Sequence, residues 1–379
     1  MKRIGIVAAE PSGDQLAGFL IEALQRLEPN LVFEGIAGEK MQARGCTSWF
    51  PMEKLSVMGL VEVVKHLREL LGIRKSLVKR WQINKPDLFI GVDAPDFNLG
   101  LEKRLHAMGI PTVQYVSPTF WAWRPGRLDT LRRFTNLVLS IFPFEAQLLS
   151  QHKVPAVYAG HPLVQQMRSY PDKSTARQQL SLGQSETILA VLPGSRMSEA
   201  RFLTNDFLTT AQQLKQQKPH LKIILPLATG KIREHVVTEL AKFPGLDIQL
   251  IDQQSQTVLA AADVVLVASG TAALETLLHR KPMVVAYKAH WLTYFILFRL
   301  GLVKSAFIAM PNILAGREIV AEMFQEKCQP QLMTAQLLSL MNDEQKRTRQ
   351  LKDYEAIIDQ LSGGNINDAA AAILELING

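Results

Sequence analysis

The residues best suited to bind an anion form a strand-loop-helix segment near position 270. Ser269, Gly270 and Thr271 follow the apolar run 264–268, and Glu275 comes one helical turn later. Serine and threonine cap helix N-termini, and glycine lets a ligand approach the backbone closely. The free N–H groups at such a helix start suit a diphosphate, and the later carboxylate suits a ribose diol. An ordinary capped helix with one solvated acid explains these residues equally well when they are taken alone.

A second anion-ready loop follows another apolar run in the same half of the chain. Gly194, Ser195 and Arg196 come after the run 188–192 and Pro193. The Pro-Gly pair forces a tight turn, and arginine brings a permanently charged fork that suits phosphate oxygens. Ligands of open α/β sheets bind beyond the carboxyl ends of the strands, where both loops should lie. Together the loops predict a nucleotide-diphosphate site.

Two acids at the end of the apolar run 88–92 are candidates for a general base. Asp93 and Asp96 lie on either side of the Ala-Pro dipeptide there, and a carboxylate at a strand end can accept a proton from a bound hydroxyl. Turn formation and helix capping are the competing roles, because Asp and Pro are common in turns. The chemistry of the two residues does not separate them, and Asp93 is the first choice.

The polar turn after the first apolar run contains Glu10, Ser12 and Gly13. It has a helix N-cap but lacks the G-x-G-x-x-G spacing of a dinucleotide site, so it does not predict NAD binding.

Short apolar runs alternate with helical stretches, and this pattern restarts after Pro162. The runs are almost continuously apolar, which is typical of parallel strands covered on both faces. The alternation is the βαβ pattern of a doubly wound sheet, present twice. The expected strands are 4–8, 31–36, 88–92, 112–116, 137–141, 156–159, 188–192, 223–227, 248–251, 264–268 and 283–286, with helices among them at 15–27, 203–216 and 272–279.

The chain length of 379 residues allows two domains of ordinary size. We predict domains at 1–168 and 175–335, followed by helices at 336–379 that pack back on the first domain or are exchanged in a homodimer. The net charge of +7 favours anionic partners such as nucleotides, phospholipid surfaces or nucleic acid. The 2 cysteines make neither a disulfide framework nor a metal-ligand set, which indicates a reducing cytoplasm.

Two stretches have the composition of interfaces. The stretch 57–77 carries Leu60, Val64, Leu67 and Leu71 at helical spacing among basic residues, which is typical of helices that dock on anionic lipid. A helix facing the core is the alternative. The aromatic stretch 291–303 is too short to span a membrane and suits a membrane-surface patch or a subunit contact.

Three other classes of segment are not expected. The first apolar run ends at Glu10 and Pro11, too early for a signal peptide, and we expect no transmembrane helix because no window reaches the ~20 apolar residues required. Aromatic and arginine residues alternate at 121–127, as in single-stranded nucleic-acid sites. No recognisable DNA or RNA module accompanies them, so we expect no nucleic-acid partner.

With these residues assembled, the chain resembles the lipid-A-disaccharide synthase family, glycosyltransferases of the GT-B type. The resemblance runs over nearly the whole chain and rests on six motifs in order. The motifs are AEPSGD at 9–14, DAPDF at 93–97, YVSP at 115–118 with WAWR at 121–124, LPGSR at 192–196, ASGTAALE at 268–275 and PNILAGR at 311–317.

The resemblance implies two Rossmann-like doubly wound domains that face a central crevice. It also implies transfer of 2,3-diacylglucosamine from its UDP-linked form to 2,3-diacylglucosamine 1-phosphate (lipid X), which yields a β-1′,6-linked disaccharide 1-phosphate and UDP. The family needs no metal or organic cofactor and acts at the cytoplasmic face of the inner membrane, where it is peripherally bound.

Residue roles follow from the same resemblance. Asp93 is implied as the base and Arg196 as a partner of the donor diphosphate, joined there by the 194–195 and 269–271 loops, with Glu275 on the ribose. Asn312 and Arg317 are implied near the reacting sugars or phosphates, and the 9–14 motif and Asp96 near the acceptor. Because the donor linkage is α and the product is β, one in-line displacement with inversion suffices.

Three other functions fit parts of this pattern. A GT-B transferase that adds N-acetylglucosamine to a polyprenyl-linked acceptor shares the fold, and so does a UDP-sugar 2-epimerase, which needs no acceptor. The third is a non-catalytic sensor of nucleotide sugars.

Overall fold

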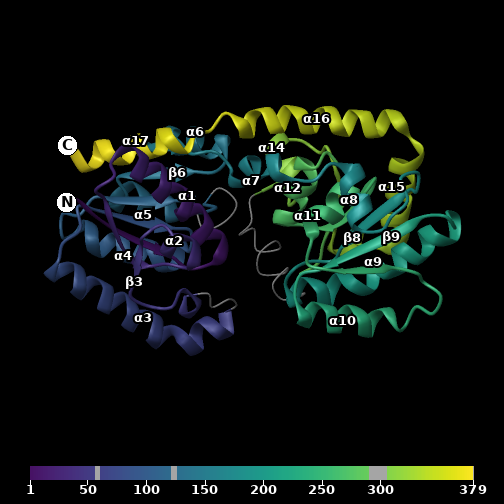
Figure 1. Cartoon of the computed structure of the whole chain (residues 1–379), viewed down its shortest axis with the longest axis horizontal. Helices are drawn as coiled ribbons and strands as arrows, with labels where there is room; N and C mark the ends of the chain where they lie inside the picture. Colours follow the sequence, from purple (N-terminus) through teal and green to yellow (C-terminus); the bar gives the residue numbers. More distant parts are fainter. Residues whose placement is uncertain (56–59, 121–125, 290–304, 379) are drawn as a thin grey trace. The chain divides into compact units, whose positions relative to one another are not determined.

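The computed structural model describes residues 1–55, 60–120, 126–289 and 305–378, while the side chains of 60–66 and 168 also lie outside the description. The chain folds into two compact units. The first contains Met1–Pro162 together with Leu361–Gly379, and the second contains Leu163–Gln360. Figure 1 shows this return of the chain: the yellow C-terminal helix lies with the purple N-terminal elements.

The first unit is built on a 7-stranded sheet of order β3-β2-β1-β4-β5-β6-β7, and every pairing in it is parallel. β4 is buried at all of its positions, as its continuous apolar sequence requires. The strands are β1 Arg3–Ala8, β2 Val32–Ile36, β3 Thr47–Ser48, β4 Leu88–Val92, β5 Thr112–Tyr115, β6 Leu137–Ser140 and β7 Ala156–Tyr158.

The second unit is built on a 6-stranded parallel sheet of order β10-β9-β8-β11-β12-β13. In each sheet the first strand, β1 or β8, lies in the interior, and later strands are added first on one side of it and then on the other. The expected pair of doubly wound, Rossmann-like α/β domains is therefore confirmed. The strands are β8 Ile188–Leu192, β9 Lys222–Leu227, β10 Gln249–Asp252, β11 Val264–Ala268, β12 Met283–Tyr287 and β13 Ala321–Phe324.

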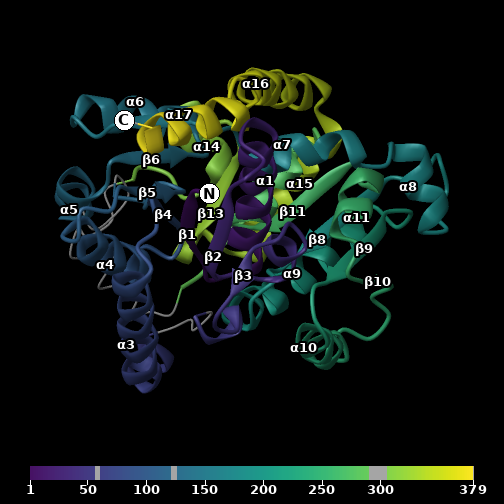
Figure 2. The same cartoon turned by 60° about the vertical axis from the view of Figure 1, so that its left-hand side comes forward.

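Helices connect successive strands and cover the sheets (Figures 1 and 2). The C-terminal helix α17 packs against α1 in the first unit. The helices are α1 Pro11–Leu27, α2 Glu39–Gln42, α3 Leu60–Ile83, α4 Pro95–His106, α5 Gly126–Phe134, α6 Pro143–Gln151, α7 Pro162–Gln166, α8 Lys173–Gln179, α9 Met197–Gln217, α10 Gly230–Leu240, α11 Ser255–Ala261, α12 Thr271–Leu278, α14 Met310–Ala315, α15 Pro330–Asn342, α16 Glu344–Ser362 and α17 Ile366–Asn378, with 3₁₀ turns at Met52–Lys54, Met167–Ser169 and Gln325–Lys327.

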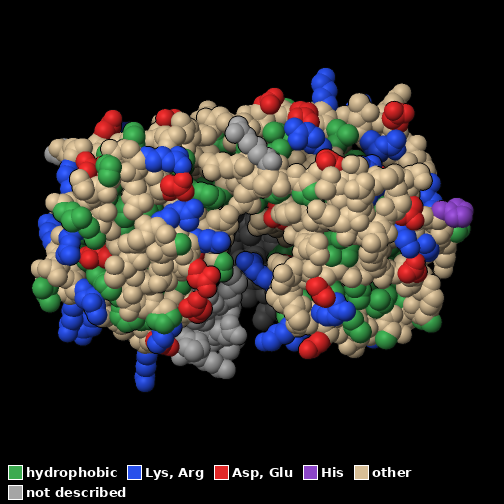
Figure 3. Space-filling model, viewed as in Figure 1, with side chains coloured by type: hydrophobic (Ala, Val, Ile, Leu, Met, Phe, Trp, Pro, Cys, Tyr) green, Lys and Arg blue, Asp and Glu red, His purple; other side chains and the backbone are tan. Residues whose placement is uncertain are grey.

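Helix α3 presents two different faces. Ile73, Leu77 and Trp81 are buried, whereas Leu67 and Leu71 are 46% and 44% exposed. The exposed pair therefore does not belong to the core of the unit. In Figure 3, Lys and Arg side chains project from the edge of the first unit that α3 follows in Figure 1.

Within the described ranges, no helix is long and apolar enough to cross a membrane. The other expected interfacial segments, 121–125 and 291–303, lie outside the described residues, as does the start of the 57–77 stretch.

Candidate functional site

A cavity of about 590 Å³ lies at the carboxyl edge of the second unit's sheet. Its walls come from the loops after β8, β9, β10 and β11 and from the end of β12. The cavity brings together every residue expected at a nucleotide diphosphate in this half of the chain: Gly194, Ser195, Arg196, Ser269, Gly270, Thr271 and Glu275.

The start of α12 forms one wall of this cavity. Gly270 is the N-cap residue, with φ 148°, and a Cβ added there would meet no atom within 4 Å. The first N–H groups of a helix have no partner inside it, so they can serve a ligand. Ser269 is held behind this turn, since its N–H donates to Ala286 O (2.8 Å) and its hydroxyl donates to Ile308 O (3.0 Å).

The loop before α9 forms another part of the wall. Gly194 has φ 121°, and a Cβ there would lie 2.5 Å from the Cβ of Glu199, so only glycine fits. Glu199 accepts hydrogen bonds from the N–H groups of Ser195 (3.2 Å) and Arg196 (3.4 Å). The guanidinium of Arg196 is 58% exposed and approaches Glu199 only to 4.0 Å. A cation is therefore available at the mouth of the cavity.

Glu275 is half-buried on α12, one turn beyond the helix start. Gln256 Nε2 donates to its Oε1 at 2.8 Å. Burial raises the pKa of this carboxyl, and the bond from Gln256 opposes that rise. Glu275 can thus accept hydrogen bonds from a hydroxylated ligand.

Sequence reasoning missed several residues of this cavity. Gln253, Gln254 and Ser255 follow β10, and Tyr287 ends β12. The strand-end rule that singled out the other two loops would have found them. Glu199 was also missed, although an acid three residues after an N-cap is a known helix-start signal.

Asp93 lies in the first unit, directly after β4. Its backbone is left-handed, with φ 51°, and its side chain is half-buried. Burial raises its pKa, while the Ala94 N–H and the charge of Arg127 oppose that rise. Asp96 differs from it, because it is exposed and forms an ion pair with Arg127 at 2.7 Å.

The turn after β1 lies against the end of β4. Gly13 is buried, and a Cβ on it would be 3.6 Å from a methyl group of Val92, the residue before Asp93. Glu10 is the half-buried N-cap residue of α1, and Ser12 is exposed in the helix's first turn. These residues of the 9–14 motif therefore lie at the same sheet edge as Asp93.

Asn312 is not exposed to a ligand. It is 0% exposed, and its amide makes four hydrogen bonds, with Ile319 N, Val320 N, Val320 O and Glu322 Oε1. Glu322 in turn accepts from the N–H groups of Ile308 and Ala309. Asn312 thus ties α14 to β13 and braces the segment that holds Ser269.

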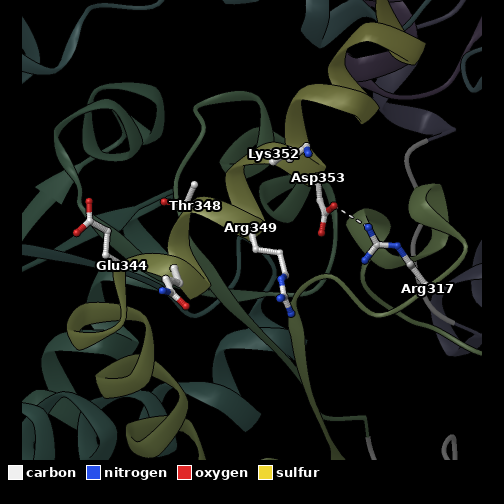
Figure 4. Close-up of a pocket in the computed structure, with 7 residues that line it drawn as sticks. Arg317, Glu344, Thr348, Arg349, Lys352 and Asp353 are labelled. Carbon is white, nitrogen blue, oxygen red and sulfur yellow. Dashed lines mark hydrogen bonds and ion pairs between the residues drawn. The ribbon is translucent and has the colours of Figure 1, made fainter.

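Arg317 lines a different cavity, an open groove of about 940 Å³ along α16. Figure 4 shows it directed at Asp353, with which it pairs at 2.6 Å. This groove is the larger of the two, but all of its lining residues except Arg317 come from a single helix, α16. The 590 Å³ cavity is the better candidate site, because its polar groups converge from several strand ends.

The described part of the chain contains no group of three or more His, Cys, Asp or Glu side chains arranged to hold a metal ion. Among the expected membrane-docking residues, Leu67 and Leu71 are exposed, whereas the side chains of Leu60 and Val64 lie outside the description.

Comparison with known proteins gives consistent results. The family model for lipid-A-disaccharide synthetase matches residues 4–377. A lipid-A-disaccharide synthase of Pseudoalteromonas translucida is 46% identical over 378 residues, covering 99% of this chain and 97% of that protein. One from Escherichia fergusonii is 44% identical over 376 residues, covering 98% and 97%.

Solved structures with the same fold are more distant in sequence. The UDP-GlcNAc 2-epimerase of Neisseria meningitidis, bound to UDP-GlcNAc, has a TM-score of 0.66 at 12% identity, covering 99% of each chain. The calicheamicin glycosyltransferase CalG4 has a TM-score of 0.59 at 14% identity, covering 100% of this chain and 98% of its own. Because epimerases and glycosyltransferases share this architecture, the fold alone does not choose between them.

Proposed function

The chain belongs to the lipid-A-disaccharide synthetase family, and we propose that it is an inverting glycosyltransferase that moves 2,3-diacylglucosamine from UDP to lipid X. The products are the β-1′,6-linked disaccharide 1-phosphate and UDP. The cavity of about 590 Å³ is the observation that best supports this proposal, since a helix start, an arginine and a carboxylate line one space.

The donor would bind in this cavity through its UDP group. The N–H groups at the start of α12 and the guanidinium of Arg196 would contact the diphosphate, and Glu275 would accept hydrogen bonds from the ribose. When UDP leaves, negative charge gathers on the diphosphate. The helix N-terminus and Arg196 stabilise that charge without any metal ion.

Asp93 would act as the base that takes the proton from the 6-hydroxyl of lipid X. Its raised pKa makes it a better proton acceptor than an ordinary aspartate. Asp96 is less suited to this role, because it is exposed and its charge is neutralised by Arg127. Glu10, Ser12 and Gly13 lie at the same sheet edge and would help to bind the acceptor.

Both substrates carry acyl chains, so the enzyme must reach a bilayer. We assign docking to the face of α3 that carries Leu67 and Leu71 among basic residues. Leu60 and Val64 continue this face in the sequence. The enzyme would thus be peripherally bound at the cytoplasmic side of the inner membrane. A homodimer also stays a prediction, which a measurement of the protein's molecular mass in solution would test.

The test is UDP release from UDP-2,3-diacylglucosamine in detergent micelles. We expect release only when lipid X is present, unchanged by a metal chelator, and reduced about 10²–10⁴-fold by Asp93→Asn. Asp96→Asn is the matched control and should retain most activity. Release without lipid X would indicate an epimerase or hydrolase, and equal loss in both variants would remove Asp93 as the base.

A further inference from the structure

Glu275 in the donor cavity is held by a short chain of side chains that leads away from the cavity. Gln256 Nε2 donates to Glu275 Oε1 at 2.8 Å, and Gln256 Oε1 lies 2.7 Å from His279 Nε2. Glu275 lies on α12, His279 is the C-cap residue of that helix one turn later, and Gln256 belongs to the first turn of α11. One amide therefore bridges two side chains of the neighbouring helix.

With Glu275 ionised, the donors and acceptors in this chain have only one consistent arrangement. An ionised carboxylate can only accept, so the amide nitrogen of Gln256 must face Glu275 and its oxygen must face His279. His279 Nε2 must then carry a proton and donate it to that oxygen. Burial and the charge of Lys281 lower the pKa of His279 to about 4, so the imidazole is neutral near pH 7 and a single tautomer is fixed.

Tyr170 covers the far end of the chain. Its ring stacks on that of His279, with centroids 4.3 Å apart and planes inclined by 12°. Its hydroxyl is buried and, within the described part of the chain, has no hydrogen-bond partner. The stacked ring restricts the plane of the imidazole, whose Nε2 contacts Gln256.

This arrangement uses Oε1 of Glu275, a residue that lines the cavity, and leaves Oε2 free of the bond from Gln256. Among the described residues, Gln256 is the only side chain that donates to Glu275. Building on the proposed UDP-donor site, we propose that Gln256 and His279 are positioning residues: they orient Glu275 so that it selects ligands with a ribose diol. Neither residue is required to touch the ligand.

The experiment compares the affinity of the full-length protein for UDP and for 2′,3′-dideoxy-UDP, which lacks the diol. We define the diol preference as the ratio of the two dissociation constants, measured by calorimetry. A charge-assisted hydrogen bond predicts a preference of about tenfold or more in the wild type. Glu275→Leu, which removes both carboxylate oxygens, should bring the preference close to one.

Two variants test the positioning residues. Gln256→Met keeps the length of the side chain but removes both hydrogen bonds, and His279→Phe keeps a flat ring under Tyr170 but removes the donor. Both should lower the diol preference about three- to tenfold while leaving the affinity for dideoxy-UDP unchanged. Gln249→Met is the matched control, because it removes a comparable half-buried bond, to Leu180 O at 2.9 Å, away from Glu275.

The outcomes separate this inference from the function on which it rests. Failure of the wild type to bind UDP overturns the proposed donor site itself. A diol preference that depends on Glu275 but survives Gln256→Met and His279→Phe overturns the positioning role and leaves the donor site standing. If these variants lose affinity for UDP and for dideoxy-UDP equally, the substitutions act on the fold alone, and the inference is wrong.

Discussion

The backbone around Asp93 is held in an unusual conformation by buried amides. Asp93 and Ala94 have φ of 51° and 42°, and Val116 at the end of the neighbouring strand has φ of 73°. For a β-branched residue this costs on the order of 1–3 kcal/mol. Gln114 Nε2 donates to Asp93 O and Val116 O at 3.2 Å, and Asn98 Nδ2 donates to Asp93 O at 2.9 Å. These bonds fix the backbone at the two strand ends.

Replacing Arg127 with glutamine should shift the acid limb of kcat/KM to higher pH. Burial raises the pKa of Asp93, and the positive charge of Arg127 opposes that rise. The base works only when deprotonated, so the rate falls as pH drops through its pKa. Removing the charge raises that pKa further, and the fall therefore begins at higher pH. The measurement is kcat/KM from acid to neutral pH.

Arg127→Lys is the control for this prediction, because it keeps the charge and should keep the acid limb close to that of the wild type. Arg127→Gln also removes the ion pair between Arg127 and Asp96, which are 2.7 Å apart. If Asp96→Asn shifts the acid limb and Arg127→Gln does not, the titrating group is not Asp93.

At the residue scale, the sequence predicts which side chains meet at the donor cavity, but not which buried amides hold the backbone at the candidate base. The residues of the donor cavity were found because parallel strands end at one sheet edge, so residues after different strands must meet. Asn98 and Gln114 were not found, since an amide within an apolar stretch carries no local signal. Asn98 Nδ2 also lies 3.5 Å from Val7 O, a residue 91 positions away, which only the folded sheet brings near.

Among the elements, α3 is divided between core and surface. Trp81 packs edge-on against Phe89 of β4, with centroids 5.4 Å apart. Gly5 makes room for it, since a Cβ there would lie 2.9 Å from the indole. The C-terminal half of α3 is thereby anchored in the core of the first unit. The exposed leucines near its N-terminal half have no such structural role.

Substituting Leu67 and Leu71 with glutamine should weaken binding to vesicles that contain anionic lipid. The two side chains are 46% and 44% exposed, and burying a large apolar side chain in lipid contributes about 1.5–3 kcal/mol. We therefore expect the double variant to lose at least tenfold in vesicle affinity, measured by cosedimentation, with UDP affinity unchanged.

Leu332→Gln is the matched control, because Leu332 is also 44% exposed but belongs to α15 of the second unit. It should leave vesicle binding intact. An equal loss in this control would mean that general surface hydrophobicity, and not the α3 face, drives binding. Unfolding of the double variant would instead assign the two leucines to the core.

The sequence predicts elements well where a continuous apolar run defines them. Every expected strand is present in the structure, and no end differs by more than one residue. β13 was missed because Ala321–Phe324 includes an acid, Glu322, whose side chain instead caps N–H groups of the 308–309 segment. β3 was missed because two residues carry no periodicity. Helix α17 was expected, but no local pattern specifies that it packs on α1.

At the scale of the whole molecule, the first unit is formed by two segments that lie far apart in the sequence. The first unit is completed by Leu361–Gly379, after the chain has built the entire second unit. Ala369, Ala370 and Ile373 of α17 are fully buried in the first unit's core. Tyr158 donates to Leu361 O at 2.7 Å, and Lys2 donates to Asn378. The stability of the first unit therefore depends on the last residues of the chain.

Gly364→Ala tests this dependence without removing any buried side chain. A Cβ at Gly364 would lie 2.3 Å from both the Cα and the N of Gly160, and a backbone cannot yield as a flexible side chain can. The resulting displacement of α17 should cost about 1–3 kcal/mol of unfolding free energy or more. Hydrogen exchange should become faster in peptides from α1 and α17 but not in those from β8–β12, and UDP affinity should stay unchanged.

Gly72→Ala is the matched control, because it lies in α3 of the same unit and a Cβ there would meet no atom within 4 Å. Alanine favours the helical conformation over glycine by roughly 0.5–1 kcal/mol, so this variant should be slightly stabilised. If Gly364→Ala speeds exchange equally in both units, the two cores do not unfold independently. If Gly364→Ala leaves hydrogen exchange unchanged in both units, the close approach of Gly160 and Gly364 is not needed to hold α17. We predict that hydrogen-exchange protection falls in the first unit while UDP affinity stays unchanged. This result arises only if the C-terminal segment stabilises the first unit and not the second.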